Sequence, residues 1–103
     1  MSDDEYVALV RDLDREVALL DGAGDGDGRG FSITPYGAAP KTAKTLGLSE
    51  GGVWIKDETG QVAGSHKSRH LFGLAVFLAV AERTGLIPPS EAARPLAIAS
   101  CGN

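Results

Sequence analysis

The middle of the chain holds a run in which a strand, a loop and a helix start follow one another closely. Residues 56–69 read Lys-Asp-Glu-Thr-Gly-Gln-Val-Ala-Gly-Ser-His-Lys-Ser-Arg. The apolar residues 53–55 before it predict a strand, and residues 57–64 predict a loop. Ser65 is a typical N-cap for the apolar helix expected over residues 65–84. Lys67 is therefore predicted to lie in the first turn of that helix.

Lys67 has the position that suits a nucleophilic amine. The helix that follows it is apolar around most of its circumference, so we expect it to be buried on more than one side. Burial and the positive end of the helix dipole both favour the neutral amine. A neutral amine is the form that attacks a carbonyl group. A solvated lysine on an amphipathic helix is the alternative that the pattern leaves open.

A second motif follows the apolar residues 96–99, which predict a strand covered on both faces. It is Ser100-Cys101-Gly102-Asn103. A strand at about 53–57, a helix at about 65–84 and a strand at about 96–100 together predict an α/β fold with a right-handed βαβ unit. Ligands of open α/β sheets bind at the carboxyl ends of the strands, where the candidate residues lie. A simple strand-to-helix turn is the alternative for residues 100–103.

These two motifs, in this order, resemble the cofactor-lysine segment of pyridoxal-phosphate enzymes of the tryptophan synthase β family. This family (fold type II) includes threonine synthase, threonine dehydratase and cysteine synthase. The resemblance covers roughly residues 31 to 103 and consists of Lys-x-Glu, Gly-Ser-x-Lys-x-Arg and Ser-x-Gly-Asn. It implies that residues 31–103 begin the catalytic domain and are truncated at Asn103. Residues 1–30 would then be an N-terminal helix and a Gly/Asp-rich loop.

The resemblance also implies a chemistry and a set of site residues. Lys67 would be the catalytic Schiff-base lysine that holds pyridoxal 5′-phosphate, with Ser65 and Asn103 also binding the cofactor. Ser100, Cys101 and Gly102 would bind the carboxylate of a small amino-acid substrate. The reaction expected is β- or γ-elimination or replacement by a lyase of the threonine synthase or threonine dehydratase type. The full-length form would be a homodimer, and the isolated chain would be inactive.

Other residues near Lys67 have a supporting role in this interpretation. Lys56 and Glu58 are expected to form an ion-pair network that orients the loop. Arg69 follows the family pattern, and a surface or ion-pairing arginine is the alternative. Thr34-Pro35 is similar to a Thr-Pro-Leu segment of the same family, with Tyr36 in place of leucine. The rival hypothesis is a non-catalytic small α/β domain that binds no cofactor.

Composition argues against several other classes of function. The net charge of −4 and a pI near 5.0 argue against a nucleic-acid surface. One cysteine excludes an internal disulfide, the acidic N-terminus is unlike a signal peptide, and the apolar run 71–81 is too short to cross a bilayer. We therefore expect a cytoplasmic protein with no membrane partner. His66 and His70 lack a third ligand nearby, so no metal site is expected.

The remaining segments predict short elements. Helical spacing over residues 3–20, with Ser2 or Asp3 as N-cap, puts apolar side chains on one stripe. The Gly/Asp-rich residues 21–30 predict a flexible loop, since they match neither a dinucleotide-binding nor an EF-hand pattern. We also expect a strand at 31–33, a helix at 41–48 and a short helix after Pro88.

Overall fold

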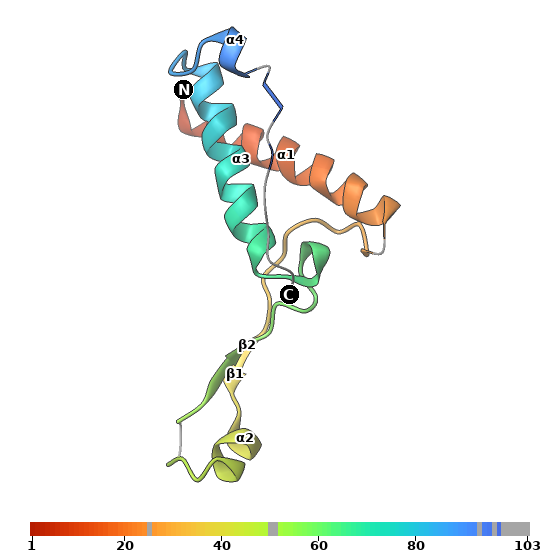
Figure 1. Ribbon diagram of the computed structural model, residues 1–103, viewed down its shortest axis with the longest axis vertical. Coiled ribbons are helices and arrows are strands. Elements are labelled where there is room, and N and C mark those ends of the chain that lie inside the picture. Colours follow the sequence, from red (N-terminus) through yellow and green to blue (C-terminus); the bar gives the residue numbers. More distant parts are fainter. Residues whose placement is uncertain (25, 50–51, 93, 96, 98–103) are drawn as a thin grey trace.

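The structure is a computed structural model that describes residues 1–24, 26–49, 52–92, 94, 95 and 97. The elements run in the order α1 (Asp3–Ala23), β1 (Tyr36–Ala38), α2 (Pro40–Thr45), β2 (Trp54–Lys56), the 3₁₀ turn η1 (Val62–Gly64), α3 (Lys67–Arg83) and α4 (Pro89–Ala92). The described chain is mostly helical, with one small antiparallel sheet (Figure 1). The mixed α/β class predicted from the sequence is confirmed at this level.

Helix α1 begins as its sequence predicts. The Oγ of Ser2 accepts a hydrogen bond from the backbone N–H of Glu5, and the Glu5 carboxylate accepts one from the N–H of Ser2. This reciprocal capping box satisfies two N–H groups that an uncapped helix would leave without partners. The helix continues to Ala23, three residues beyond the expected end at Leu20, and ends at Gly24, whose N–H bonds to the carbonyl of Asp21.

The first strand does not lie at residues 31–33, where the sequence predicts it. The backbone groups there bond to side chains instead: Phe31 N–H donates to Asp14, and Ser32 bonds through both N–H and C=O to Gln61. Ile33 is 99% exposed, whereas Thr34 beside it is 5% exposed. Strand β1 starts after Pro35, whose carbonyl accepts a hydrogen bond from the N–H of Asp57. Side-chain bonding to the backbone has replaced ladder pairing in this segment.

Strands β1 and β2 pair antiparallel and carry α2 between them. Tyr36 lies opposite Lys56, and Ala38 lies opposite Trp54. Helix α2 is shorter than the predicted 41–48, since Gly47 adopts φ 67° and the N–H of Leu48 closes back onto the carbonyl of Ala43. This is the usual way in which glycine ends a helix.

The β1–α2–β2 unit extends away from the helices α1 and α3 (Figure 1). The radius of gyration is 18.0 Å, against about 13 Å for a compact domain of this length. The large apolar side chains exposed on this unit are Tyr36, Leu46, Leu48, Trp54 and Ile55. The rings of Tyr36 and Trp54 stack with their centroids 5.4 Å apart.

Helix α3 has the predicted position but not the predicted burial. It contacts α1 and the short helix α4, which lies close to where the second short helix is expected. Ala81 is buried, and the ring of Phe31 packs 4.6 Å from that of Phe72. Phe77, however, is 63% exposed, and Leu74 is exposed as well. The expectation of burial on several sides is therefore wrong within the described residues, because α1 and α4 cover only part of the helix.

Of the three elements of the predicted βαβ unit, the structure describes a strand and a helix in the expected ranges, and the unit itself stays a prediction. Strand β2 falls within the expected 53–57, and α3 falls within the expected 65–84. The second strand, at 96–100, lies outside the described residues apart from Ala97. The strand that pairs with β2 in the described chain is β1, and it runs antiparallel.

Candidate active site

Lys67 is the first residue of α3, and the chain enters this helix through a tightly bonded turn. Ser65 has extended backbone angles, its Oγ accepts a hydrogen bond from the N–H of Lys67 at 3.2 Å, and its carbonyl accepts one from the Ser68 Oγ at 2.6 Å. His66 takes the N-cap position and makes no side-chain capping bond, whereas Ser65, the expected N-cap, lies one residue earlier and bonds to the first N–H of the helix. Lys67 itself is half-buried, and the first turn of α3 carries no acidic side chain.

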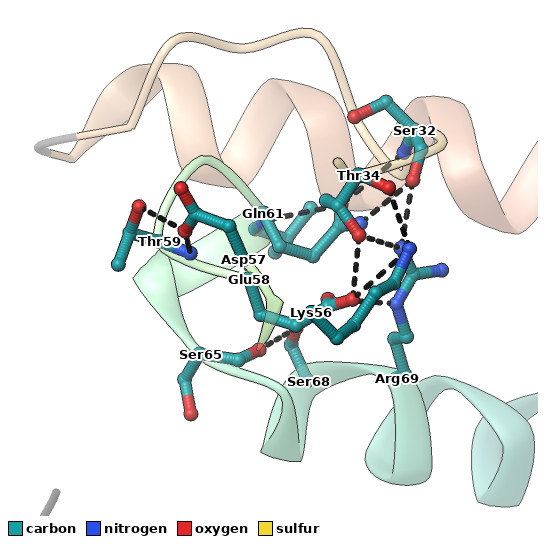
Figure 2. Close-up of polar contacts among 11 residues, drawn as sticks. Ser32, Thr34, Lys56, Asp57, Glu58, Thr59, Gln61, Ser65, Ser68 and Arg69 are labelled. Atoms are coloured by element: carbon teal, nitrogen blue, oxygen red, sulfur yellow. Dashed lines mark hydrogen bonds and ion pairs between the residues drawn. The ribbon is translucent and has the colours of Figure 1, made fainter. Parts of the chain in front are cut away.

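Glu58 is the centre of a polar cluster beside this turn (Figure 2). One carboxylate oxygen accepts a hydrogen bond from Arg69 Nε at 2.8 Å, and the other accepts one from Thr34 Oγ1 at 2.6 Å. Lys56 Nζ lies 3.8 Å from the same carboxylate and donates to the carbonyl of Thr34 at 2.6 Å. The ion pair expected between Lys56 and Glu58 is thus confirmed, and the structure adds Arg69 to it.

Arg69 and Gln61 connect this cluster to Ser32. The Arg69 guanidinium donates to the carbonyl of Ser32 at 2.8 Å and to Thr34 Oγ1 at 3.3 Å. The Gln61 amide, only 5% exposed, donates to the same Ser32 carbonyl and accepts from the Ser32 N–H. Three separate segments, at residues 32–34, 56–61 and 69, are therefore held together by side chains.

The cluster keeps Glu58 ionised. Its side chain is 13% exposed, and burial by itself would raise the pKa of the carboxyl. The hydrogen bond from Arg69, followed by the one from Thr34, outweighs burial and holds the pKa of Glu58 below its usual range. Nearby, the side chain and N–H of Thr59 lower the pKa of Asp57 through two hydrogen bonds.

The loop before Lys67 contains two consecutive residues with left-handed backbone angles. Ala63 has φ 55° and Gly64 has φ 58°. The N–H of Ala63 donates to Oδ1 of Asp21, at the end of α1, across 3.1 Å. An open groove separates this loop from the end of α1. Its lining residues are Leu20, Asp21, Gly24, Gly26, Asp27, Thr59, Gly60, Gln61, Ala63 and Gly64.

The structure brings together only part of the predicted site. Ser65 and Lys67 lie at the start of α3, whereas Ser100, Cys101, Gly102 and Asn103 lie outside the described residues. The sequence interpretation missed Ser32, Gln61 and Asp21, and it gave Thr34 little weight. No local sequence signal marks Gln61 or Asp21, because both bond to distant backbone groups. Gln61 bonds to the backbone of a residue 29 positions away, and Asp21 to that of a residue 42 positions away.

No protein-family model, curated protein or solved structure matches this chain. Among the residues that the structure describes, no helix has both the length and the apolar character needed to cross a bilayer. Within the same residues, no group of three or more His, Cys, Asp or Glu side chains is arranged to hold a metal ion.

Proposed function

We propose that Lys67 is the cofactor-binding lysine of a pyridoxal-phosphate-dependent enzyme that acts on a small amino acid. The reaction would be a β- or γ-elimination or replacement of the threonine synthase or threonine dehydratase type. The observation that carries the proposal is the position of Lys67: it begins α3, two residues after Ser65, whose hydroxyl accepts the N–H of Lys67. The resemblance of residues 31–103 to fold type II enzymes supplies the identity of the cofactor.

The side chains around the turn fit a cofactor that bears a carbonyl group. Lys67 supplies a primary amine on a side chain that is half-buried rather than enclosed. The neighbouring Glu58 carboxylate already accepts hydrogen bonds from Arg69 and Thr34 and lies near Lys56. The acid of the cluster is therefore engaged by other groups, and its role is to fix the loop.

Each residue then has a separate task. Bound pyridoxal phosphate would supply an electron sink for the bonds at the substrate's α-carbon. Lys67 would hold the cofactor and, once displaced by the substrate amine, its Nζ would take the α-proton as general base. Ser65 would keep the first turn of α3 in place and contact the cofactor. Ser100, Cys101 and Gly102 would bind the substrate carboxylate, and Asn103 would bind the cofactor.

The apolar side chains exposed on α3 indicate that another polypeptide segment covers this helix. Phe77, Leu74 and Leu86 are exposed on and just after α3, and contiguous exposed apolar surface is typical of interfaces. We propose that further polypeptide of the enzyme covers this face and that the 103-residue chain alone is inactive. The same surface is what favours the second candidate, a non-catalytic α/β interaction domain without cofactor.

Absorption spectroscopy separates the two candidates. Pyridoxal phosphate added to the complete gene product should give a visible band that differs from the free cofactor, and Lys67→Arg should abolish it. Lys44→Arg changes an exposed lysine of α2, away from the site, and is the matched control. A band that survives in Lys67→Arg would assign the cofactor to another lysine, and absence of the band from the unmodified protein would favour the domain without cofactor.

A further inference from the structure

The end of α1 carries an aspartate in a place that is unfavourable for the helix itself. Asp21 lies in the last turn of α1, which has no basic residue. The carbonyl groups at a helix C-terminus give that end a partial negative charge, so a carboxylate there opposes the dipole. A residue that breaks a local rule in this way commonly has a partner elsewhere in the fold.

The partner of Asp21 is the loop that leads to Lys67. Its Oδ1 accepts the N–H of Ala63 at 3.1 Å, a contact between residues 42 positions apart. Its backbone carbonyl accepts the N–H groups of Gly24 and Gly26. The chain of Gly26 passes so close that an added Cβ would overlap the Asp21 carboxylate. The half-buried carboxylate thus lies between the turn that ends α1 and the loop.

Ala63 has backbone angles that an alanine seldom adopts unaided. With φ 55° and ψ 20°, it lies in the left-handed region, where its Cβ crowds the backbone and glycine is usual. The bond to Asp21 is an interaction that compensates for this conformation. Gly64 follows with φ 58°, after which Ser65 returns to extended angles and the chain enters α3.

We propose that Asp21 is a positioning residue, which holds Ala63 in its left-handed conformation and so sets the path by which the loop delivers Lys67. This inference rests on the proposed function of Lys67 for its catalytic meaning. Asp21 touches no reacting group in this account and acts only through the backbone of residues 63–65.

Amide hydrogen exchange tests the contact without cofactor. Asp21→Ala removes the acceptor, and exchange of the Ala63 N–H should become about tenfold faster, as loss of one hydrogen bond implies. Asp21→Asn keeps an oxygen acceptor and should retain most of the protection. Asp12→Ala removes an exposed carboxylate of the same helix, paired locally with Arg15, and should leave Ala63 unchanged. Unchanged exchange in Asp21→Ala, or equal acceleration in Asp12→Ala, would overturn the proposal.

Labelling of Lys67 tests the consequence. The rate at which pyridoxal phosphate followed by borohydride modifies Lys67 should fall in Asp21→Ala. It should recover when Ala63→Gly is added, since glycine adopts left-handed angles without assistance. Failure of Ala63→Gly to restore labelling would show that Asp21 does not act through this backbone. If Lys67 of the unmodified protein is not labelled, the proposed function fails, while the exchange comparison still decides whether Asp21 holds the loop.

Discussion

Arg69 Nε lies 2.8 Å from the carboxylate of Glu58, and this pair joins helix α3 to the residues that follow strand β2. Thr34 completes the junction by donating its hydroxyl to the other carboxylate oxygen. The pair fixes the two ends of the loop that precedes Lys67. The geometry of the proposed site therefore depends on the ionised state of one carboxyl group.

Stability should for this reason decrease in acid. The pKa of Glu58 is lowered in the folded chain, so its contribution is complete above the unfolded pKa of about 4.3. The contribution is lost as the pH falls below that value through the lowered folded pKa. Denaturation midpoints between pH 6 and pH 3 should decrease less in Glu58→Gln than in the unmodified protein.

Glu16→Gln, at an exposed position on α1, is the control for that comparison. Its acid dependence should match that of the unmodified protein. If Glu58→Gln shows the same acid dependence as well, then other carboxyl groups account for the effect and the Glu58 junction does not.

Gln61 should stabilise the protein through its hydrogen bonds more than through its volume. It is nearly fully buried and bonds to both backbone groups of Ser32. Gln61→Ala and Gln61→Met should each lower the free energy of unfolding by about 1 kcal/mol, because the N–H of Ser32 loses its acceptor, whereas the carbonyl of Ser32 keeps the bond from Arg69. Urea denaturation measures the loss, and a Met variant as stable as the unmodified protein would assign the role to packing.

The hydrogen bond between the Ser65 hydroxyl and the N–H of Lys67 should contribute to the free energy of unfolding as much as a typical capping bond at a helix N-terminus. Ser65→Ala removes the acceptor for the N–H of Lys67 and should cost about 1 kcal/mol. Ser65→Thr keeps a hydroxyl and should recover most of it, as measured by thermal unfolding. Equal losses in both variants would indicate a steric requirement at this buried position rather than a cap.

The predicted roles of the last residues can be separated by spectrum and affinity. If Asn103 binds the cofactor, Asn103→Ala in the complete gene product should shift the visible absorption band. Ser100→Ala should chiefly weaken substrate binding, by about 1 kcal/mol for one neutral hydrogen bond. Unchanged spectra and unchanged kinetics in both variants would leave residues 100–103 with a purely structural role.

Local sequence signals predicted the parts of the chain that depend on neighbouring residues. Ser2 was one of the two N-caps expected for α1, and its hydrogen bonds join residues three positions apart. The bond from the N–H of Lys67 to Ser65 joins residues two positions apart. Chemical complementarity was enough to predict the pairing of Lys56 with Glu58, whereas the partner of Arg69, eleven residues further along the chain, was not identified. Such local contacts depend on residue type and spacing, both of which can be read directly from the sequence.

Contacts between distant segments could not be predicted in this way. Phe31 and Ser32 were expected to form a strand, yet their backbone N–H groups donate hydrogen bonds to the side chains of Asp14 and Gln61. The burial of α3 was misjudged because apolar composition indicates which surface prefers to be covered, not what covers it. Phe77 is an example: it is a large apolar residue of α3, and yet its side chain is exposed.

The most direct test of the central claim is the site of covalent attachment. The complete gene product should be incubated with pyridoxal phosphate, reduced with borohydride, digested and mapped by mass spectrometry. One phosphopyridoxyl group is expected, on Lys67, and it should be lost in Lys67→Arg. Modification of Lys56 or Lys44 in preference to Lys67, or labelling spread evenly over the lysines, would contradict this claim.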